Sequence, residues 1–196
     1  MNEFLDMLQT EVDEWVDMGI AWTDQGKRLL HQAVEYFVSS ENQNALIDIE
    51  TLLKKDVNVN TRNTNLATPL HVAVKSKSNT LELVELLVER GADLTAKSRH
   101  GATPLHNACR EGSGHIVTYL IREGSDKDAL THDGDTPLHH AVRFERKDII
   151  RILILAGANT MIKNVRGEHP MNLKCSREIK EEFKMAIIKK QQMDHI

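Results

Sequence analysis

Short apolar stripes at helical spacing recur along the chain, separated by polar turns. In each stripe large aliphatic residues stand three or four positions apart, the spacing that lines one face of an α-helix. Three copies are in phase: Leu81, Val84, Leu87 and Val88; Ile116, Val117, Leu120 and Ile121; Ile149, Ile150, Leu153 and Leu155. A glycine follows each copy, at Gly91, Gly124 and Gly157, where it can adopt the left-handed conformation that ends a helix. The pattern predicts three short amphipathic helices with defined ends.

A four-residue string, Thr-Pro-Leu-His, precedes each stripe. It occurs at 68–71, 103–106 and 136–139, so successive copies are 35 and 33 residues apart. A degraded copy stands at 169–172 and an earlier one at 28–31, and all 4 prolines of the chain occupy its second position. Threonine can cap the first free N–H groups of a helix, and proline at the first helical position loses no hydrogen bond. The string predicts the start of a first helix in each repeat.

One repeat is thus a helix, a turn, a second helix and an extended hairpin that turns at a further glycine. The segments 67–96, 102–130 and 136–163 resemble consecutive ankyrin repeats, including the Gly-Ala-Asp motif at 91–93. The resemblance implies an all-α ankyrin-repeat solenoid of helix-turn-helix plus β-hairpin units. We expect about five repeats over residues 26–196, including atypical terminal caps. Their approximate bounds are 26–65, 66–100, 101–133, 134–166 and 167–196, the last being a partial cap.

The first and last repeats depart from the pattern. The first has no Thr-Pro, carries about seven extra residues around 39–44, and has Asp56 and Leu66 where glycine is usual. The last has Asn172 in place of histidine, and a polar helix is predicted there over about 177–191. Because a terminal repeat lacks a neighbour on one side, such departures are typical of caps.

Residues 1–25 form an acidic leader with seven acidic and no basic residues. Its apolar residues fall on one stripe, which predicts an amphipathic helix: Phe4, Leu5, Leu8, Val12, Trp15 and Val16. Such a helix could cap the open face of the first repeat. Alternatively, it could dock in a groove of a partner or swap into a second copy of this chain. The sequence leaves both alternatives open.

Basic residues recur in register on the surface where ankyrin-repeat proteins bind partners, as the resemblance implies. Lys75, Arg110 and Arg143 each follow the small residues of a first helix, and neighbouring helices pack about 8–10 Å apart. We expect them to form a ladder that contacts an acidic or phosphorylated segment of another protein. The other candidate contacts on hairpins and first helices are Arg62, Lys97, Arg99, His100, His132, His140, Phe144, Lys163 and Arg166.

A simpler interpretation is that these charges only keep the surface soluble. Acidic residues are interspersed among them, at Glu35, Glu111 and Asp133. The sequence does not decide between a ladder and a solvated surface.

Ten histidines raise the question of a metal site, but the pattern argues against one. His71, His106 and His139 recur one repeat apart, so they cannot converge on an ion whose ligand atoms must lie within about 2.0–2.3 Å. The resemblance implies that they are structural and bridge backbone and capping groups. Cys109, next to a small alanine, is predicted to be a core residue. No metal, cofactor or catalytic motif is expected, and the chain is predicted not to be an enzyme.

Composition narrows the function further. The net charge of −4 argues against general nucleic-acid binding, and no apolar run is long enough for membrane insertion. Two cysteines and the lack of a basic-apolar leader favour a cytoplasmic location, and we expect a monomer. The chain is therefore predicted to bind another protein. A regulatory inhibitor of a transcription factor or kinase, and an effector of an intracellular bacterium or virus acting in the host cytoplasm, stay open as alternatives.

Overall fold

The computed structural model describes residues 24–40, 44–54, 57–75, 80–111 and 113–194. Within these residues are nine α-helices, one short 3-10 helix and no β-strand. The chain divides into two compact units, Met1–Asp93 and Leu94–Ile196. Most of the acidic leader and Asp56 lie outside the described residues, so the cap and docking hypotheses for the leader stay predictions.

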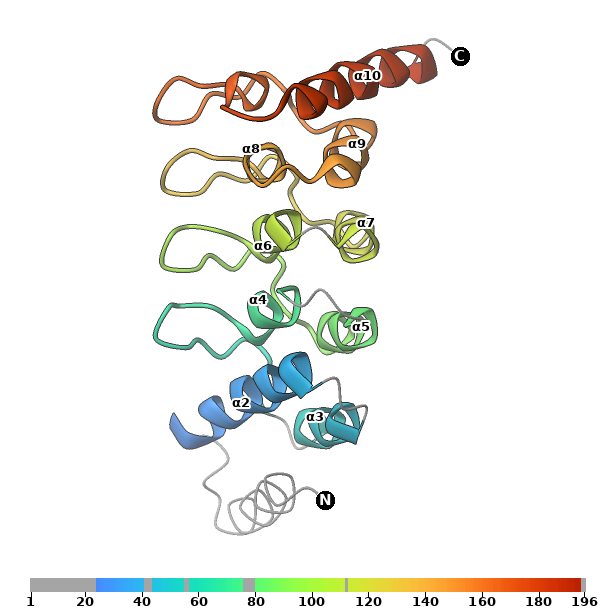
Figure 1. The fold of residues 1–196 in the computed structure, drawn as a ribbon. Coiled ribbons are helices and arrows are strands. Elements are labelled where there is room, and N and C mark those ends of the chain that lie inside the picture. The colour runs from blue at the N-terminus through green and yellow to red at the C-terminus, as the bar shows by residue number, and fades with distance from the viewer. Residues whose placement is uncertain (1–23, 41–43, 55–56, 76–79, 112, 195–196) are drawn as a thin grey trace. The chain divides into compact units, whose positions relative to one another are not determined.

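Both units are built from short helices packed in pairs. The first unit has α2 (Asp24–Ser40), α3 (Asn44–Lys54), α4 (Pro69–Ala73) and α5 (Leu81–Glu89). The second unit has α6 (Pro104–Glu111), α7 (Gly114–Arg122), α8 (Pro137–Arg143), α9 (Lys147–Leu155), η1 (Pro170–Asn172) and α10 (Arg177–Asp194). In the first unit α2 packs against α3 and α4, and α4 packs against α5. In the second unit α6 and α8 form one column and α7 and α9 another (Figure 1).

The Thr-Pro-Leu-His string begins helices as predicted. At the start of α8 the backbone N–H of His139 donates to Thr136 Oγ1 at 3.3 Å, and the backbone N–H of Thr136 donates to His139 Nδ1 at 3.1 Å. Pro137 occupies the first helical position, where a missing N–H leaves no bond unmade. The reciprocal pair satisfies two donors that a helix start otherwise leaves free.

The end of α7 shows why the second helices stop at glycine. The backbone N–H groups of Gly124 and Ser125 donate to the carbonyl groups of Ile121 and Leu120, at 3.1 and 2.9 Å. Gly124 has a φ of +94°, which a residue with a side chain adopts only with strain. The two bonds close the last turn of the helix, and the predicted helix end is confirmed.

The connections between repeats are hairpin-shaped turns without strands. The resemblance predicts β-hairpins, but no β-strand forms among the described residues. The turn at Gly101 is closed by two backbone bonds, from Gly101 N–H to Ser98 O at 2.8 Å and from Ser98 N–H to Ala102 O at 2.9 Å. A single closed turn is too short for a ladder of paired strands.

Successive hairpins of the second unit approach each other closely. The backbone N–H of His132 donates to the carbonyl of His100 at 3.1 Å. A Cβ atom on Gly101 would lie 2.6 Å from His132 Cδ2 and 2.7 Å from its backbone nitrogen. Gly101 also has a φ of +75°. Glycine is therefore required at position 101 both by the conformation of the turn and by the closeness of the neighbouring hairpin. The periodicity of the sequence does not reveal the close approach of the hairpins.

The atypical first repeat keeps the geometry of the others with different residues. Leu66 has a φ of +55° and its N–H donates to Asn63 O at 2.8 Å, which is the turn that glycine makes elsewhere. His31 Nε2 lies 2.9 Å from the carbonyl oxygen of Ala67. In this repeat, however, the string at 28–31 lies inside α2 and does not begin the helix.

The core of each unit lies between its helices. The buried residues of the second helices are Leu83, Val84 and Leu87 in α5, Ile116, Val117 and Leu120 in α7, and Ile149, Ile150, Leu153 and Ile154 in α9. The predicted stripes supply these cores, and the residues at their edges, Leu81, Val88, Ile121 and Leu155, are half-buried. Cys109 is fully buried as predicted, and burial raises the pKa of its thiol.

The last repeat ends the second unit with a long polar helix. The predicted helix is present as α10, which buries Ile179, Phe183 and Ala186 and packs against α9. The degraded string at Pro170 forms only the single turn η1. Among the helices that the structure describes, none combines the length and the apolar character needed to cross a bilayer.

Candidate functional site

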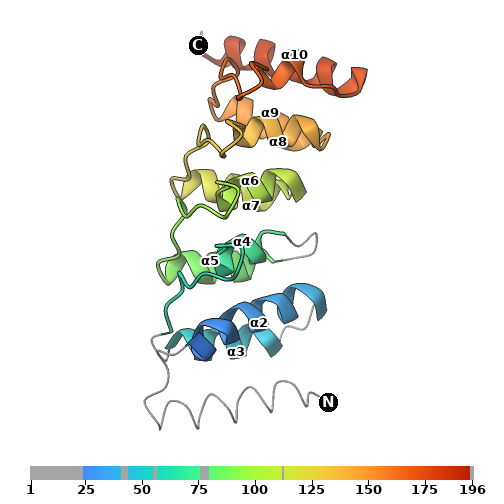
Figure 2. The ribbon, with the colours of Figure 1, turned by 90° about the vertical axis from the view of Figure 1, so that its left-hand side faces the viewer.

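Helices α6 and α8 bring four of the predicted contact residues onto one face of the second unit. Arg110 lies in the last turn of α6 and Arg143 in the last turn of α8, and Phe144 caps the end of α8. The ring of His140 lies 6.3 Å from the ring of Phe144, centroid to centroid. Burial and, to a smaller extent, the positive charges of both arginines lower the pKa of His140. Figure 2 views this unit from its hairpin side.

His140 is half-buried at the centre of this face. Its ring meets the ring of His106 edge to face, with centroids 5.1 Å apart. Burial lowers the pKa of His140 to about 4, so the ring is neutral near pH 7. Its Nδ1 atom is buried, and no hydrogen-bond partner for it lies among the described residues. His140 is one of the predicted partner contacts, and that role stays a prediction.

Arg143 is fixed by a buried carboxylate. Its Nη1 atom donates to Asp135 Oδ2, and the Asp135 side chain is only 3% exposed. Asn164 Nδ2 donates to the other oxygen of Asp135 at 3.0 Å. Burial alone would raise the pKa of Asp135, but these two hydrogen bonds and the charge of Arg143 outweigh it, so the pKa lies below its ordinary value. Arg143 is therefore a positioned group whose charge is already balanced.

Arg110 is held more loosely. Its Nε atom donates to the neighbouring Glu111 at 3.0 Å, and both side chains are partly exposed. Arg146, at the start of α9, donates from Nε to the backbone carbonyl of Arg110 at 2.7 Å. The two arginines predicted to form a ladder thus each have a carboxylate partner, and this face is less positive than the sequence suggests.

The hairpin candidates of the second unit fall into two groups. Lys97 donates from Nζ to the carbonyl of Leu130 at 3.0 Å, and Arg166 pairs with Glu168 at 3.1 Å. The remaining hairpin candidates are exposed: Arg99, His100, His132 and Lys163. The first group therefore reinforces the hairpins, and all six side chains are exposed to solvent.

Two candidates lie in the first unit. Arg62 is exposed in the turn before Leu66, and Lys75 is exposed just after α4. A continuous ladder from these residues to Arg110 and Arg143 stays a prediction.

The recurring histidines are structural, as the resemblance implies. His106 Nδ1 accepts from the backbone N–H of Thr103 at 3.1 Å, and burial lowers the pKa of His106 to about 3. His71 makes the same contact with Thr68 at 3.1 Å. Among the residues with described positions, no group of histidine, cysteine and acidic side chains could hold a metal ion.

The sequence interpretation missed Asp135. It stands 33 residues after Ala102, so a carboxylate occupies a position where the preceding repeat has a small apolar residue. That change of residue type within the repeat is the signal that could have identified it. Its consequence is the fixed orientation of Arg143 described above.

Comparison with known families agrees with the geometry. A family model described as ankyrin repeats (3 copies) matches residues 2–98 and 77–164. The match begins before residue 26, the predicted start of the repeats, and stops short of the last repeat. No curated protein matches the chain. Since the match spans most of the sequence and the helix pairs, capping strings and turns recur as it requires, the chain belongs to the ankyrin-repeat family.

Proposed function

We propose that the chain binds a partner protein through the face formed by α6 and α8 and the adjoining hairpins. Ankyrin repeats generally mediate protein–protein interaction. The observation that carries the proposal is Phe144, whose side chain is 42% exposed at the end of α8, next to His140 and close to Arg143. Aromatic and arginine side chains supply much of the binding energy in protein interfaces.

The electrostatics of this face favour a mixed partner segment. His140 is neutral near pH 7, and Arg143 is balanced by Asp135, so the centre is close to uncharged. Arg110 is 36% exposed and pairs with its neighbour Glu111, whose side chain is 20% exposed. An acidic or phosphorylated residue of the partner could bind Arg110 while an apolar side chain packs on Phe144.

Exposed cations of the hairpins extend this surface. Arg99 and Lys163 are exposed in two hairpins of the second unit. Exposed charges at the rim of an interface change the rate of association more than the final affinity. These residues are therefore assigned to steering an acidic partner, and Phe144 to anchoring it.

The other roles suggested by the sequence use the same surface. A regulatory inhibitor and a host-directed effector both require a bound protein, so loss of Phe144 should weaken either. Ankyrin repeats are typically interaction modules without catalysis. The cytoplasmic location and the monomeric state stay predictions.

Affinity capture with matched variants tests the proposal. The wild-type chain, Phe144→Ala and Arg110→Glu would each be used as bait, and any captured protein would then be titrated against each purified chain. We expect its affinity to fall roughly tenfold or more for Phe144→Ala, because an interface anchor loses its apolar contact. Arg110→Glu should also weaken binding, and its effect should be larger in low salt than in high salt because salt screens the charge.

Two control variants separate binding from general surface effects. Ile47→Ala truncates another exposed apolar side chain, 63% exposed, in α3 of the first unit. Arg122→Glu reverses an exposed charge at the end of α7. If a specifically captured partner binds all five chains equally, this face is not the binding surface.

A further inference from the structure

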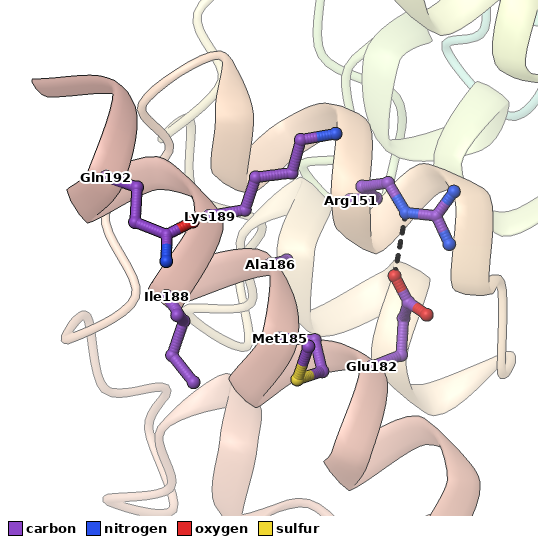
Figure 3. A pocket seen from close by; sticks show the side chains of 7 residues that line it. All are labelled: Arg151, Glu182, Met185, Ala186, Ile188, Lys189 and Gln192. Carbon is purple, nitrogen blue, oxygen red and sulfur yellow. Dashed lines mark hydrogen bonds and ion pairs between the residues drawn. The ribbon is translucent and has the colours of Figure 1, made fainter. Parts of the chain in front are cut away.

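A second surface, on the opposite column of helices, carries an open groove. Helix α10 buries Ile179, Phe183 and Ala186, yet Met185 is 61% exposed and Ile188 is 47% exposed. The groove beside these side chains has a volume of about 490 Å³. It is lined by Arg151 of α9 and by Glu182, Met185, Ala186, Ile188, Lys189 and Gln192 of α10 (Figure 3).

The carboxylates of α10 are all balanced within the chain. Each of its four acidic side chains pairs with a basic one: Glu178 with Lys147, Glu181 with Arg177 at 2.8 Å, Glu182 with Arg151 at 2.8 Å, and Asp194 with Lys190 at 2.7 Å. The pair between Glu182 and Arg151 crosses one end of the groove (Figure 3). These pairs leave no acidic side chain of α10 to balance its other cations.

Three lysines of α10 have no ion-pair partner among the described residues. They are Lys180, Lys184 and Lys189, and all three are exposed. From 183 to 193 the helix carries three lysines and no acidic residue. At about 100° per residue, Lys184 and Lys189 stand on opposite sides of the row formed by Met185 and Ile188. The open apolar row is therefore bordered by positive charge on both sides.

We propose that the groove between α9 and α10 binds an acidic amphipathic helix of a partner protein. Such a helix would place its apolar side chains against Met185 and Ile188, and its flanking carboxylates next to Lys184 and Lys189. Methionine adapts its shape to different apolar surfaces, which suits an open groove. The groove includes no residue of α6 or α8, so this proposal does not depend on the function proposed for their face.

An anionic membrane is the competing ligand, because it also combines negative charge with an apolar interior. The geometry favours the protein helix. The apolar row on α10 is short and borders a hollow, and the one aromatic residue of the helix, Phe183, is buried. Helices that lie on membranes present a broad apolar face, commonly with exposed aromatic residues.

Methionine methyl resonances of the full chain provide a local test. The probe is a synthetic helical peptide of about five turns with leucine at every third and fourth position and glutamate elsewhere. We expect it to shift the Met185 methyl resonance and to leave that of Met161, which is exposed in the turn after α9, unchanged. The same peptide with lysine for glutamate should bind at least roughly tenfold more weakly.

Variants of exposed residues link the binding to the groove. Lys184→Glu combined with Lys189→Glu should lower the affinity for the glutamate peptide roughly tenfold or more. Ile188→Asn should lower this affinity as well. Lys174→Glu reverses an exposed lysine outside α10 and should leave the affinity unchanged. Circular dichroism melting of each variant shows whether it remains folded.

Several results would overturn the assignment. One is equal affinity for the glutamate and lysine peptides, and another is the absence of a Met185 shift with the glutamate peptide. A Met185 shift that appears only with vesicles of phosphatidylcholine and phosphatidylserine would show that the groove binds a membrane. Self-association of the full chain that is abolished by Ile188→Asn would show that the groove binds a second copy of this chain.

Discussion

The Nε2 atom of His106 lies 3.1 Å from the backbone carbonyl oxygen of Asp135, which belongs to the following repeat. The Nδ1 atom of the same ring accepts the backbone N–H of Thr103 at 3.1 Å. A neutral imidazole with its proton on Nε2 satisfies both contacts at once. One buried side chain thus joins a helix start to the hairpin of the next repeat.

Replacing His106 should destabilise the second unit. His106→Ala removes the acceptor for the N–H of Thr103, a buried residue, and one of two donors to Asp135 O, which still accepts from the N–H of Thr131 at 3.0 Å. Leaving the Thr103 N–H unpaired lowers the free energy of unfolding by about 1–3 kcal/mol. Urea denaturation followed by circular dichroism measures the loss. His100→Ala, at an exposed histidine of the hairpin, is the control and should change the free energy by less than about 0.5 kcal/mol.

Acid should destabilise the fold through two histidines, the buried His106 and the half-buried His140. Burial lowers the pKa of His106 to about 3 and that of His140 to about 4, whereas an unfolded histidine has a pKa of about 6.5. Above pH 6.5 both rings are neutral in both states, and stability is unaffected. Below it the unfolded chain takes up protons that the folded chain does not, so the free energy of unfolding falls by about 2 kcal/mol per ring by pH 5.

Urea denaturation at a series of pH values checks this prediction. His140→Gln should make the free energy of unfolding depend less steeply on pH, because the contribution of one histidine ring is removed. His115→Gln, at an exposed histidine of α7, is the matched variant for replacing a histidine outside this cluster. A slope that His140→Gln leaves unaltered would show that the ring titrates equally in both states.

Much of this architecture follows from the sequence because it depends on local chemistry. Threonine and proline fix helix starts, and glycine fixes helix ends, so three repeats and their phase can be predicted without any structure. The atypical first repeat is harder, because Leu66 adopts a glycine-like φ that its side chain disfavours. No local pattern indicates that conformation.

The electrostatics of the candidate surface could not be predicted in the same way. Repeat phase places Arg110 and Arg143 on one face, but it does not show which carboxylates reach them. The partner of Arg143 is Asp135, eight residues earlier, whereas the partner of Arg110 is its neighbour Glu111. Periodicity therefore predicts where a side chain points. The net charge of the surface depends on contacts that are specific to each repeat.

The carboxylate of Asp135 should stabilise the fold as well as orient Arg143. Asp135→Asn keeps the shape of the side chain but removes the charge that faces Arg143. Because Asp135 is buried and Arg143 is partly exposed, we expect a loss of about 1–3 kcal/mol in the free energy of unfolding. A double-mutant cycle with Arg143→Met isolates the pair, since the two single changes should then cost more in sum than the double change. Strict additivity would mean that the pair contributes nothing.

Gly101→Ala should be more damaging than Gly124→Ala, although both glycines have positive φ. A Cβ added to Gly124, whose φ is +94°, would have no atom within 4 Å, so alanine there meets only backbone strain of about 1–2 kcal/mol. At Gly101 the added Cβ would also lie 2.6 Å from His132 Cδ2, and the hairpins would have to separate. Urea denaturation of the two variants should differ by at least about 1 kcal/mol. Equal losses would show that the hairpins move apart freely.

Leu66→Gly should stabilise the chain, the reverse of most substitutions to glycine. Leu66 has a φ of +55°, which costs a residue with a side chain about 1–2 kcal/mol, and its side chain is 45% exposed, so little packing is lost. The greater freedom of glycine in the unfolded chain offsets about 0.5–1 kcal/mol of this gain. We therefore expect the free energy of unfolding to rise by about 0.5–1 kcal/mol. Leu130→Gly, where a leucine 41% exposed has an ordinary negative φ, should instead destabilise the chain, and equal losses in the two variants would contradict the assignment of strain to Leu66.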